Sequence, residues 1–230
     1  KDEDVRDAHN RVVQILWNSY KFFELYKEGY DGRTAHVGSL HVMDRWILAR
    51  LDTCIHEVTA SFEGYDLPRA CAGIRSFIDD YSTWYVRRSR ERVKGTDMKD
   101  KQYALAVERH VLEGISKVIA PVMPFLAESI SQGIGSSESV HLAAWPHVRG
   151  RSLWGRLFGG RRDEELLAAM KKVRGVVSQA LEARERAGIR IRQPLPALFV
   201  REELTPEFAE LVAAEVNVKK VVGGDKRIPL

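Results

Sequence analysis

The sequence predicts a mainly α protein, an antiparallel helix bundle followed by a small α+β unit. Apolar side chains recur at helical spacing in several segments, and short polar stretches with glycine or proline separate them. The composition of the sequence changes after about residue 148, where glycine and arginine become common and short extended segments are predicted. Helices with one apolar face each and short connections bury those faces against one another, which favours a bundle.

Five helices are expected in the bundle. The first spans 4–26 and the second about 42–62, with a polar, glycine-spaced loop between them. The third and longest spans 65–95, the fourth 99–119, and a short fifth helix begins near Pro124. Proline at 121 ends the fourth helix because it cannot donate the backbone hydrogen bond that a further turn requires.

The helix over 65–95 organises the bundle. Asp66 can accept hydrogen bonds from the free amides of the first turn, Pro68 lies within that turn, and Gly95 ends the helix. One face of it is apolar. That face contains Ala70, Ile74, Phe77, Ile78, Tyr81, Trp84 and Tyr85.

The last turns of this helix are basic: Arg87, Arg88, Arg90, Arg92 and Lys94 surround a single Glu91. Arg88 and Arg92 continue the apolar face, where an unpartnered arginine is rare, so they are expected to meet a phosphate or a buried carboxylate. The other three cations point outward. A solvated helix end, favoured by the helix dipole, explains those three equally well.

The tail predicts a second unit. Residues 149–162 are interpreted as a linker or insertion, and 163–187 as a helix that Gly188 ends. A strand-like segment over 196–201, a helix from Thr205 to about Glu215 and a strand-like segment over 216–222 follow. The predicted domains are therefore 1–148, the helical bundle, and 163–230, a small α+β unit.

A second basic cluster lies in this tail. Arg184, Arg186, Arg190 and Arg192 surround Gly188 and continue into Gln193. Guanidinium groups match phosphate oxygens, and contacts to the backbone supply most of the affinity for nucleic acids. Two tryptophans are further candidates: Trp46, beside Arg45, and Trp145, in an extended stretch, could stack on bases. A core position is the default for Trp17 and Trp84.

Catalytic and metal-binding patterns are absent from the sequence. It has no glycine-rich phosphate loop, no HExxH and no nucleophile elbow, and its seven histidines show no metal-ligand spacing.

The two cysteines, Cys54 and Cys71, form no disulfide framework, which favours a reducing compartment. No signal peptide or membrane-spanning run is found. With a pI of about 9.1, these residues favour an RNA-binding domain over an enzyme.

Several motifs resemble the region that follows the catalytic core of isoleucyl-tRNA synthetases, which are class I aminoacyl-tRNA synthetases. They occur in the order of that family and cover nearly the whole chain. DRWILARL and APVMPFLAESI are shared with the related valyl enzymes, whereas WYVRRSRER and AGIRIRQPL are specific to the isoleucyl type. The motifs are DRWILARL (44–51), YDLPRA (65–70) with DDYSTWYVRRSRER (79–92), APVMPFLAESI (120–130), ESVHLAAWP (138–146) and ERAGIRIRQPL (185–195).

The resemblance implies that the bundle is an anticodon-binding domain and that the tail begins the C-terminal region of such an enzyme. The full enzyme uses ATP and magnesium to attach isoleucine to its tRNA, but its HIGH and KMSKS signatures are absent here. We therefore expect a cytoplasmic, monomeric piece of a longer chain, which begins at Lys1, not at a methionine. It should bind isoleucine tRNA and the rest of the synthetase, need no cofactor or metal of its own, and be inactive in aminoacylation.

The candidate tRNA contacts rest on charge and aromatic character. They are Arg45, Trp46, Arg87, Arg88, Arg90, Arg92, Lys94, Arg190, Arg192 and Gln193. Two other functions remain open: a helical interaction or scaffold module whose arginines meet acidic protein, and the anticodon domain of a valyl-type synthetase. The first predicts no salt-dependent RNA binding, and the second predicts a different anticodon preference.

Overall fold

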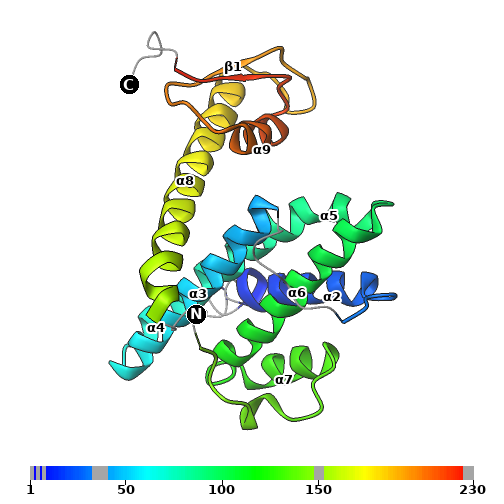
Figure 1. Ribbon diagram of the computed structural model, residues 1–230, viewed down its shortest axis with the longest axis vertical. Coiled ribbons are helices and arrows are strands. Elements are labelled where there is room, and N and C mark those ends of the chain that lie inside the picture. The colour runs from blue at the N-terminus through cyan, green and yellow to red at the C-terminus, as the bar shows by residue number, and fades with distance from the viewer. Residues whose placement is uncertain (1–2, 4–5, 7–8, 33–40, 148–152, 225–230) are drawn as a thin grey trace. The chain divides into compact units, whose positions relative to one another are not determined.

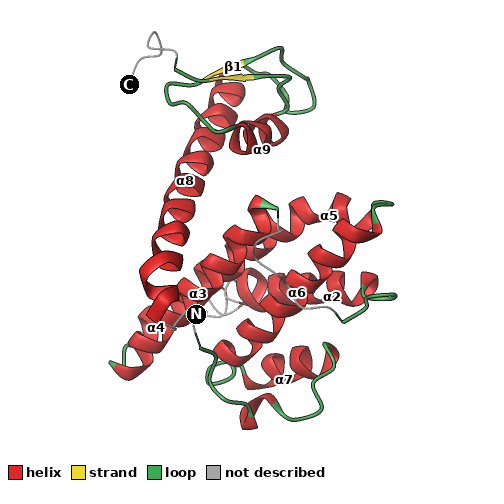
Figure 2. Cartoon of the chain, viewed as in Figure 1, coloured by secondary structure: helices red, strands yellow, loops and turns green. Residues whose placement is uncertain are grey.

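The structure, a computed structural model, describes residues 3, 6, 9–32, 41–147 and 153–224, with side chains masked over 153–162. The chain divides into two compact units, unit 1 over Lys1–Gly159 and unit 2 over Gly160–Leu230. Helices dominate both, and the only strands in the described part form one short sheet in unit 2, so the predicted fold class is confirmed (Figure 2). No described helix is both long and apolar enough to cross a membrane.

Unit 1 is a helical bundle (Figure 1). Helix α3 packs against α4 and α6, and α6 also packs against α5 and α7. The elements are the π-helix η1 (His9–Val13), α2 (Gln14–Tyr26), α3 (Val42–Glu63), α4 (Leu67–Asp79), the π-helix η3 (Asp80–Val86), α5 (Arg87–Lys94), α6 (Met98–Ile119), α7 (Pro124–Gly133) and the 3-10 turn η4 (Val140–Leu142).

The long central helix expected over 65–95 is present, but it contains a π-helical segment. α4, η3 and α5 follow one another without a break, and the Asp66 carboxylate accepts a hydrogen bond from the amide of Arg69 at 3.1 Å, as expected of the cap. In η3 each turn takes in more residues than in an α-helix, so the helix face shifts. Tyr85 and Val86 are consequently buried there, while Trp84 is partly exposed.

The core of unit 1 lies where α3, α4, η3 and α6 meet. Its largest side chains include Trp46, Phe77, Tyr81 and Tyr85, each no more than 2% exposed. The suggestion that Trp46 stacks on a base is therefore wrong for this structure, because its indole is enclosed by the bundle. Trp145 is partly buried as well: its indole N–H donates to the Thr59 hydroxyl at 2.8 Å.

Helix α8 (Leu153–Arg186) begins in unit 1 and continues into unit 2, which also contains strand β1 (Leu198–Phe199), helix α9 (Pro206–Val216) and strand β2 (Val221–Val222). The two strands pair in parallel, Leu198 opposite Val221, and an isolated bridge joins Leu195 to Val218. α8 begins at Leu153, inside the segment interpreted as a linker or insertion over 149–162, so this segment is helical from Leu153 onward.

Candidate nucleic-acid interface

The basic end of the central helix presents three cations to solvent. Arg87, Arg90 and Lys94 are exposed and lie three and four residues apart on α5, so they share one helix face. The Arg90 guanidinium lies over the ring of Phe22 in α2, 5.9 Å from its centroid, and the rings of Phe22 and Tyr26 are 5.0 Å apart. Cations beside partly exposed aromatic rings can meet both the phosphates and the unstacked bases of an RNA loop.

Arg92 lies on the opposite side of α5 and faces the core. Its Nη1 and Nη2 donate to the two carboxylate oxygens of Asp44 in α3, at 2.7 and 2.9 Å. Nη2 and Nε also donate to Asp100 in α6, at 2.7 and 2.9 Å. The Asp44 side chain is fully buried and that of Arg92 is 14% exposed. Of the two partners expected for Arg92, the structure shows the buried carboxylate, so this guanidinium is not available to RNA.

Arg45 and Arg88, the remaining candidates of the bundle, are partly buried. Arg45 directly follows Asp44 on α3, and Arg88 lies one helical turn before Arg92 on α5. Their side chains are less exposed than those of Arg90 and Lys94, which makes them the weaker candidates for phosphate contacts.

A buried acid lies close to the Asp44–Arg92 pair. Glu108 of α6 is fully buried, and neither of its carboxylate oxygens has a hydrogen-bond partner among the described residues. Burial raises the pKa of Glu108 to about 8, the Asp44 carboxylate adds to the rise, and Arg92 opposes it. The Tyr85 hydroxyl donates to Asp44 at 2.9 Å, and burial raises its pKa well above the usual value. This polar centre joins α3, η3, α5 and α6 under the basic helix end.

The sequence does not reveal this polar centre. Asp44, Asp100 and Glu108 are ordinary acidic residues in helices, and the pattern of the chain does not show that all three converge on one arginine. The one sequence feature that indicates a buried partner is Arg92 itself, because it lies on the apolar face of its helix.

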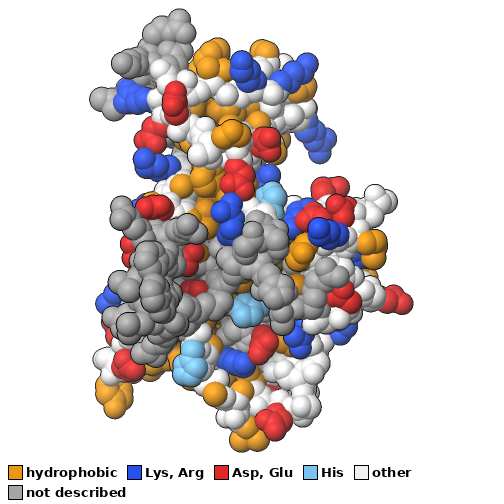
Figure 3. Space-filling model, viewed as in Figure 1, with side chains coloured by type: hydrophobic (Ala, Val, Ile, Leu, Met, Phe, Trp, Pro, Cys, Tyr) orange, Lys and Arg blue, Asp and Glu red, His pale blue; other side chains and the backbone are white. Residues whose placement is uncertain are grey.

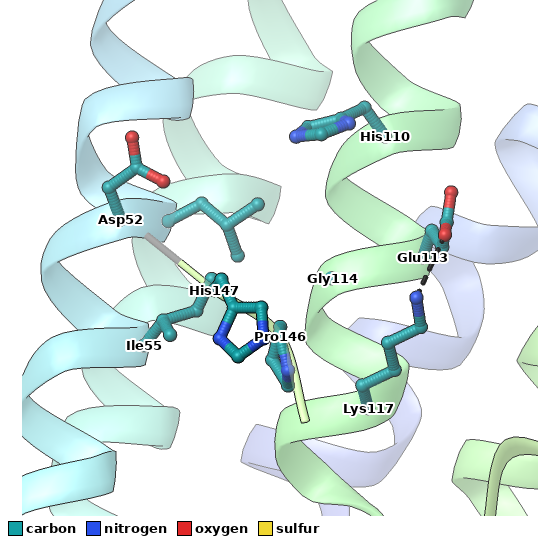
Figure 4. Close-up of a pocket in the computed structure, with 9 residues that line it drawn as sticks. Asp52, Ile55, His110, Glu113, Gly114, Lys117, Pro146 and His147 are labelled. Carbon is teal, nitrogen blue, oxygen red and sulfur yellow. Dashed lines mark hydrogen bonds and ion pairs between the residues drawn. The ribbon is translucent and has the colours of Figure 1, made fainter. Parts of the chain in front are cut away.

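A cavity of about 150 Å³ opens between α3, α6 and the segment that follows η4 (Figure 4). Its polar side chains are mixed in charge, and Lys117 pairs with Glu113 at 2.9 Å. The carboxylates of Asp52 and Glu113 in the wall disfavour a phosphate. It is lined by Leu51, Asp52, Ile55, His110, Glu113, Gly114, Lys117, Pro146 and His147. No cluster of metal-ligand type occurs among the described residues.

The candidates of unit 2 lie in the loop that follows α8. Arg190, Arg192 and Gln193 are all exposed. Arg184, in the last turn of α8, is instead buried at 5% exposure, and within the described residues its guanidinium donates hydrogen bonds to backbone carbonyls alone. Figure 3 shows several Lys and Arg side chains over the end of unit 2 where β1 lies.

Comparison with known proteins gives a consistent result. Residues 44–199 match a family model described as the anticodon-binding domain of tRNA ligase. The chain is 37% identical over 223 residues to the isoleucine–tRNA ligase of Mycobacterium tuberculosis, with 96% of this chain and 20% of the relative aligned. It is 35% identical over 234 residues to that of Bifidobacterium longum, with 95% and 21% aligned. For Methanopyrus kandleri the identity is 35% over 240 residues, with 97% and 21% aligned. The chain thus spans about a fifth of the length of these relatives.

Proposed function

Because the chain belongs to the family of anticodon-binding domains of tRNA ligases, in its isoleucine–tRNA ligase branch, we propose that it binds the anticodon stem-loop of isoleucine tRNA. The observation that supports this most directly is the exposed face of α5, where Arg90 and Lys94 face solvent and the Arg90 guanidinium lies over the ring of Phe22, which neighbours the ring of Tyr26 in α2.

The cations of α5 would hold phosphate groups of the stem-loop. Guanidinium and ammonium groups release condensed counterions when they meet phosphates, which supplies affinity without sequence preference. Preference for one anticodon requires contacts to bases, and the Phe22–Tyr26 pair offers a stacking surface next to Arg90.

The aminoacylation reaction would take place in another part of the parent enzyme. In this proposal a longer isoleucine–tRNA ligase in the cytoplasm supplies the site that uses ATP and magnesium, and the present chain contributes tRNA binding as a monomeric module. The chain alone is expected to bind tRNA but not to form isoleucyl-tRNA.

Binding of the chain to isoleucine tRNA, and to the same tRNA with a swapped anticodon, across a salt series tests this function. We expect tighter binding to the native anticodon and a steep fall of affinity with salt. Arg90→Gln with Lys94→Gln should weaken binding and lower the slope of log affinity against log salt by about two. The matched control is Arg69→Gln with Arg75→Gln, which removes two exposed cations from α4.

Three results would contradict the proposal in different ways. Equal affinity for both anticodons would leave a clamp on the tRNA backbone without anticodon recognition. An equal loss in the control variant would show that α5 has no special part in binding. No binding even at low salt would favour a scaffold that meets acidic protein.

A further inference from the structure

The loop after α8 has its backbone carbonyls turned toward a buried guanidinium. α8 ends in a Schellman motif: Gly188 has φ +66, and the Ile189 amide donates to the Arg184 carbonyl at 2.9 Å. The Arg184 side chain then donates from Nη2 to the Gln193 carbonyl at 2.8 Å and from Nη1 to the Arg190 carbonyl at 3.4 Å.

The same guanidinium also holds the end of α9. Its Nε donates to the Val216 carbonyl and its Nη2 to the Asn217 carbonyl, both at 3.0 Å. Asn217, in the left-handed region at φ +51, donates from Nδ2 to the Ile191 carbonyl at 2.8 Å. Arg184 and Asn217 therefore take up the carbonyl oxygens of residues 190, 191 and 193, and Arg184 forms no ion pair within the described chain.

The outward side of the loop is consequently rich in donors. Arg190, Ile191 and Arg192 are exposed, and their three backbone N–H groups have no acceptor in the part of the chain that the structure describes. Residues 186–193 contain three arginines and no acid. Lys219 and Lys220, exposed in the segment that pairs with this loop at Leu195, add to the positive charge.

A favourable interaction with the dipole of α8 does not explain the positions of Arg190 and Arg192. Arg184 and Arg186 already occupy the last turn of α8, where a cation interacts best with the carbonyl end of a helix. Arg190 and Arg192 lie beyond that turn, and the loop carbonyls they follow are already hydrogen-bonded.

We propose that residues 187–194 form a preformed loop that binds phosphate groups of an RNA backbone, through the side chains of Arg190 and Arg192 and the free amides between them. Amide and guanidinium donors both suit phosphate oxygens. Because Arg184 and Asn217 hold the loop in place before binding, little ordering is needed when RNA binds. This inference rests on the proposed function, since the RNA is the tRNA that unit 1 would bind.

Tests of this inference use the whole chain, isoleucine tRNA and a salt series. Arg190→Gln with Arg192→Gln should weaken binding several-fold near physiological salt and lower the salt slope by one to two. The loss should be the same for the native and the swapped anticodon, because phosphates are alike in both. Lys171→Gln with Lys172→Gln, which removes two exposed cations from the middle of α8, is the matched control.

The two proposals fail in distinguishable ways. If the variant at 190 and 192 binds like the unaltered chain, or no worse than the control, while the variant at 90 and 94 loses affinity, the loop proposal is overturned and anticodon-loop binding stands. If the unaltered chain does not bind tRNA at all, the proposed function is overturned with it.

A separate variant tests whether Arg184 acts as a positioning residue that holds the loop over 187–194. Arg184→Lys keeps the charge but cannot reach four carbonyls, so we expect weaker tRNA binding although Arg190 and Arg192 remain. Combining it with the variant at 190 and 192 should add little further loss, because both changes disable the same contact. Fully additive losses would overturn the positioning role.

Discussion

At the scale of single residues, cations within two turns of one helix have opposite surroundings. Arg90 and Lys94 face solvent, whereas Arg92 is enclosed between Asp44 and Asp100. Its guanidinium holds the pKa of the Asp100 carboxyl below its usual range, mainly through their hydrogen bonds. By charge alone, all three side chains would be equal candidates for RNA contacts. The acidic partners of Arg92 make the difference, because they occupy its guanidinium.

Replacing Arg92 should therefore destabilise the bundle directly. Arg92→Leu would leave the fully buried Asp44 carboxylate without its cation, and breaking such a buried pair costs about 3–5 kcal/mol. Arg90→Leu, on the exposed face, should change stability by less than about 0.5 kcal/mol. Urea unfolding of both variants measures the difference. Equal stabilities would show that Asp44 does not depend on Arg92.

Glu108 makes stability depend on pH. Its pKa in the folded chain is about 8, above that of an unfolded glutamate, because burial disfavours the charged form and the nearby Asp44 carboxylate adds to the effect. Arg92 opposes the shift, and the Tyr81 and Tyr85 side chains that face this acid titrate only at higher pH. The folded state then binds more protons than the unfolded state between about pH 4.5 and pH 8.

The expected result is a loss of stability as pH rises through that window, with a plateau above it. Glu108→Gln, which resembles the protonated acid, should remove most of the dependence. Unfolding midpoints of both proteins at a series of pH values give the measurement, and the Asp66→Asn variant serves as a control because Asp66 is exposed. A parallel pH dependence in the Glu108→Gln variant would mean that another group is responsible.

At the scale of elements, close approach of α7 to α2 depends on one glycine. A Cβ added to Gly133, the last residue of α7, would lie 1.9 Å from the Tyr20 hydroxyl and 2.5 Å from its Cζ. Tyr20 is 3% exposed and its hydroxyl donates to Glu24 at 2.7 Å, so the ring has little room to move.

Gly133→Ala should consequently cost about 1–3 kcal/mol through this overlap. Gly73→Ala in α4 is the matched control: its Cβ would meet only Val58, at an ordinary 3.5 Å, and alanine is the better helix former by about 0.5–1 kcal/mol. Thermal unfolding should thus separate the two, Gly133→Ala below and Gly73→Ala at or above the unaltered chain. A Gly133→Ala variant of unchanged stability would contradict the close packing of α2 and α7.

Most helices of the bundle were predictable because each has a clear apolar face and a clear end. The central helix, its cap at Asp66 and the helix over 99–119 agree with the structure within a few residues. The π-segment η3 was not predictable, because a change of helical register depends on what the flanking turns pack against. Nor was the start of α8 at Leu153: Gly159 and Gly160 favour a loop, yet each costs a helix only about 1 kcal/mol.

At the scale of the whole molecule, the charge is nearly balanced, with 36 Lys and Arg against 32 Asp and Glu. The distribution matters more than the total, because the cations proposed to contact RNA gather on α5 in unit 1 and on the loop after α8 in unit 2. A tRNA ligase domain that binds RNA through such patches needs no large net charge.

The sequence by itself determined the fold class, the family, the positions of most helices and the two basic clusters. These follow from periodicity, caps and short motifs, which are properties of neighbouring residues. Only the tertiary structure decided which basic side chains are available to RNA. It buried Trp46, enclosed Arg92 between two carboxylates, left Glu108 without a hydrogen-bond partner in the described part of the chain and turned the loop carbonyls toward Arg184. Each of these outcomes depends on partners from segments distant in the chain, and local pattern contains no information about which of them meet.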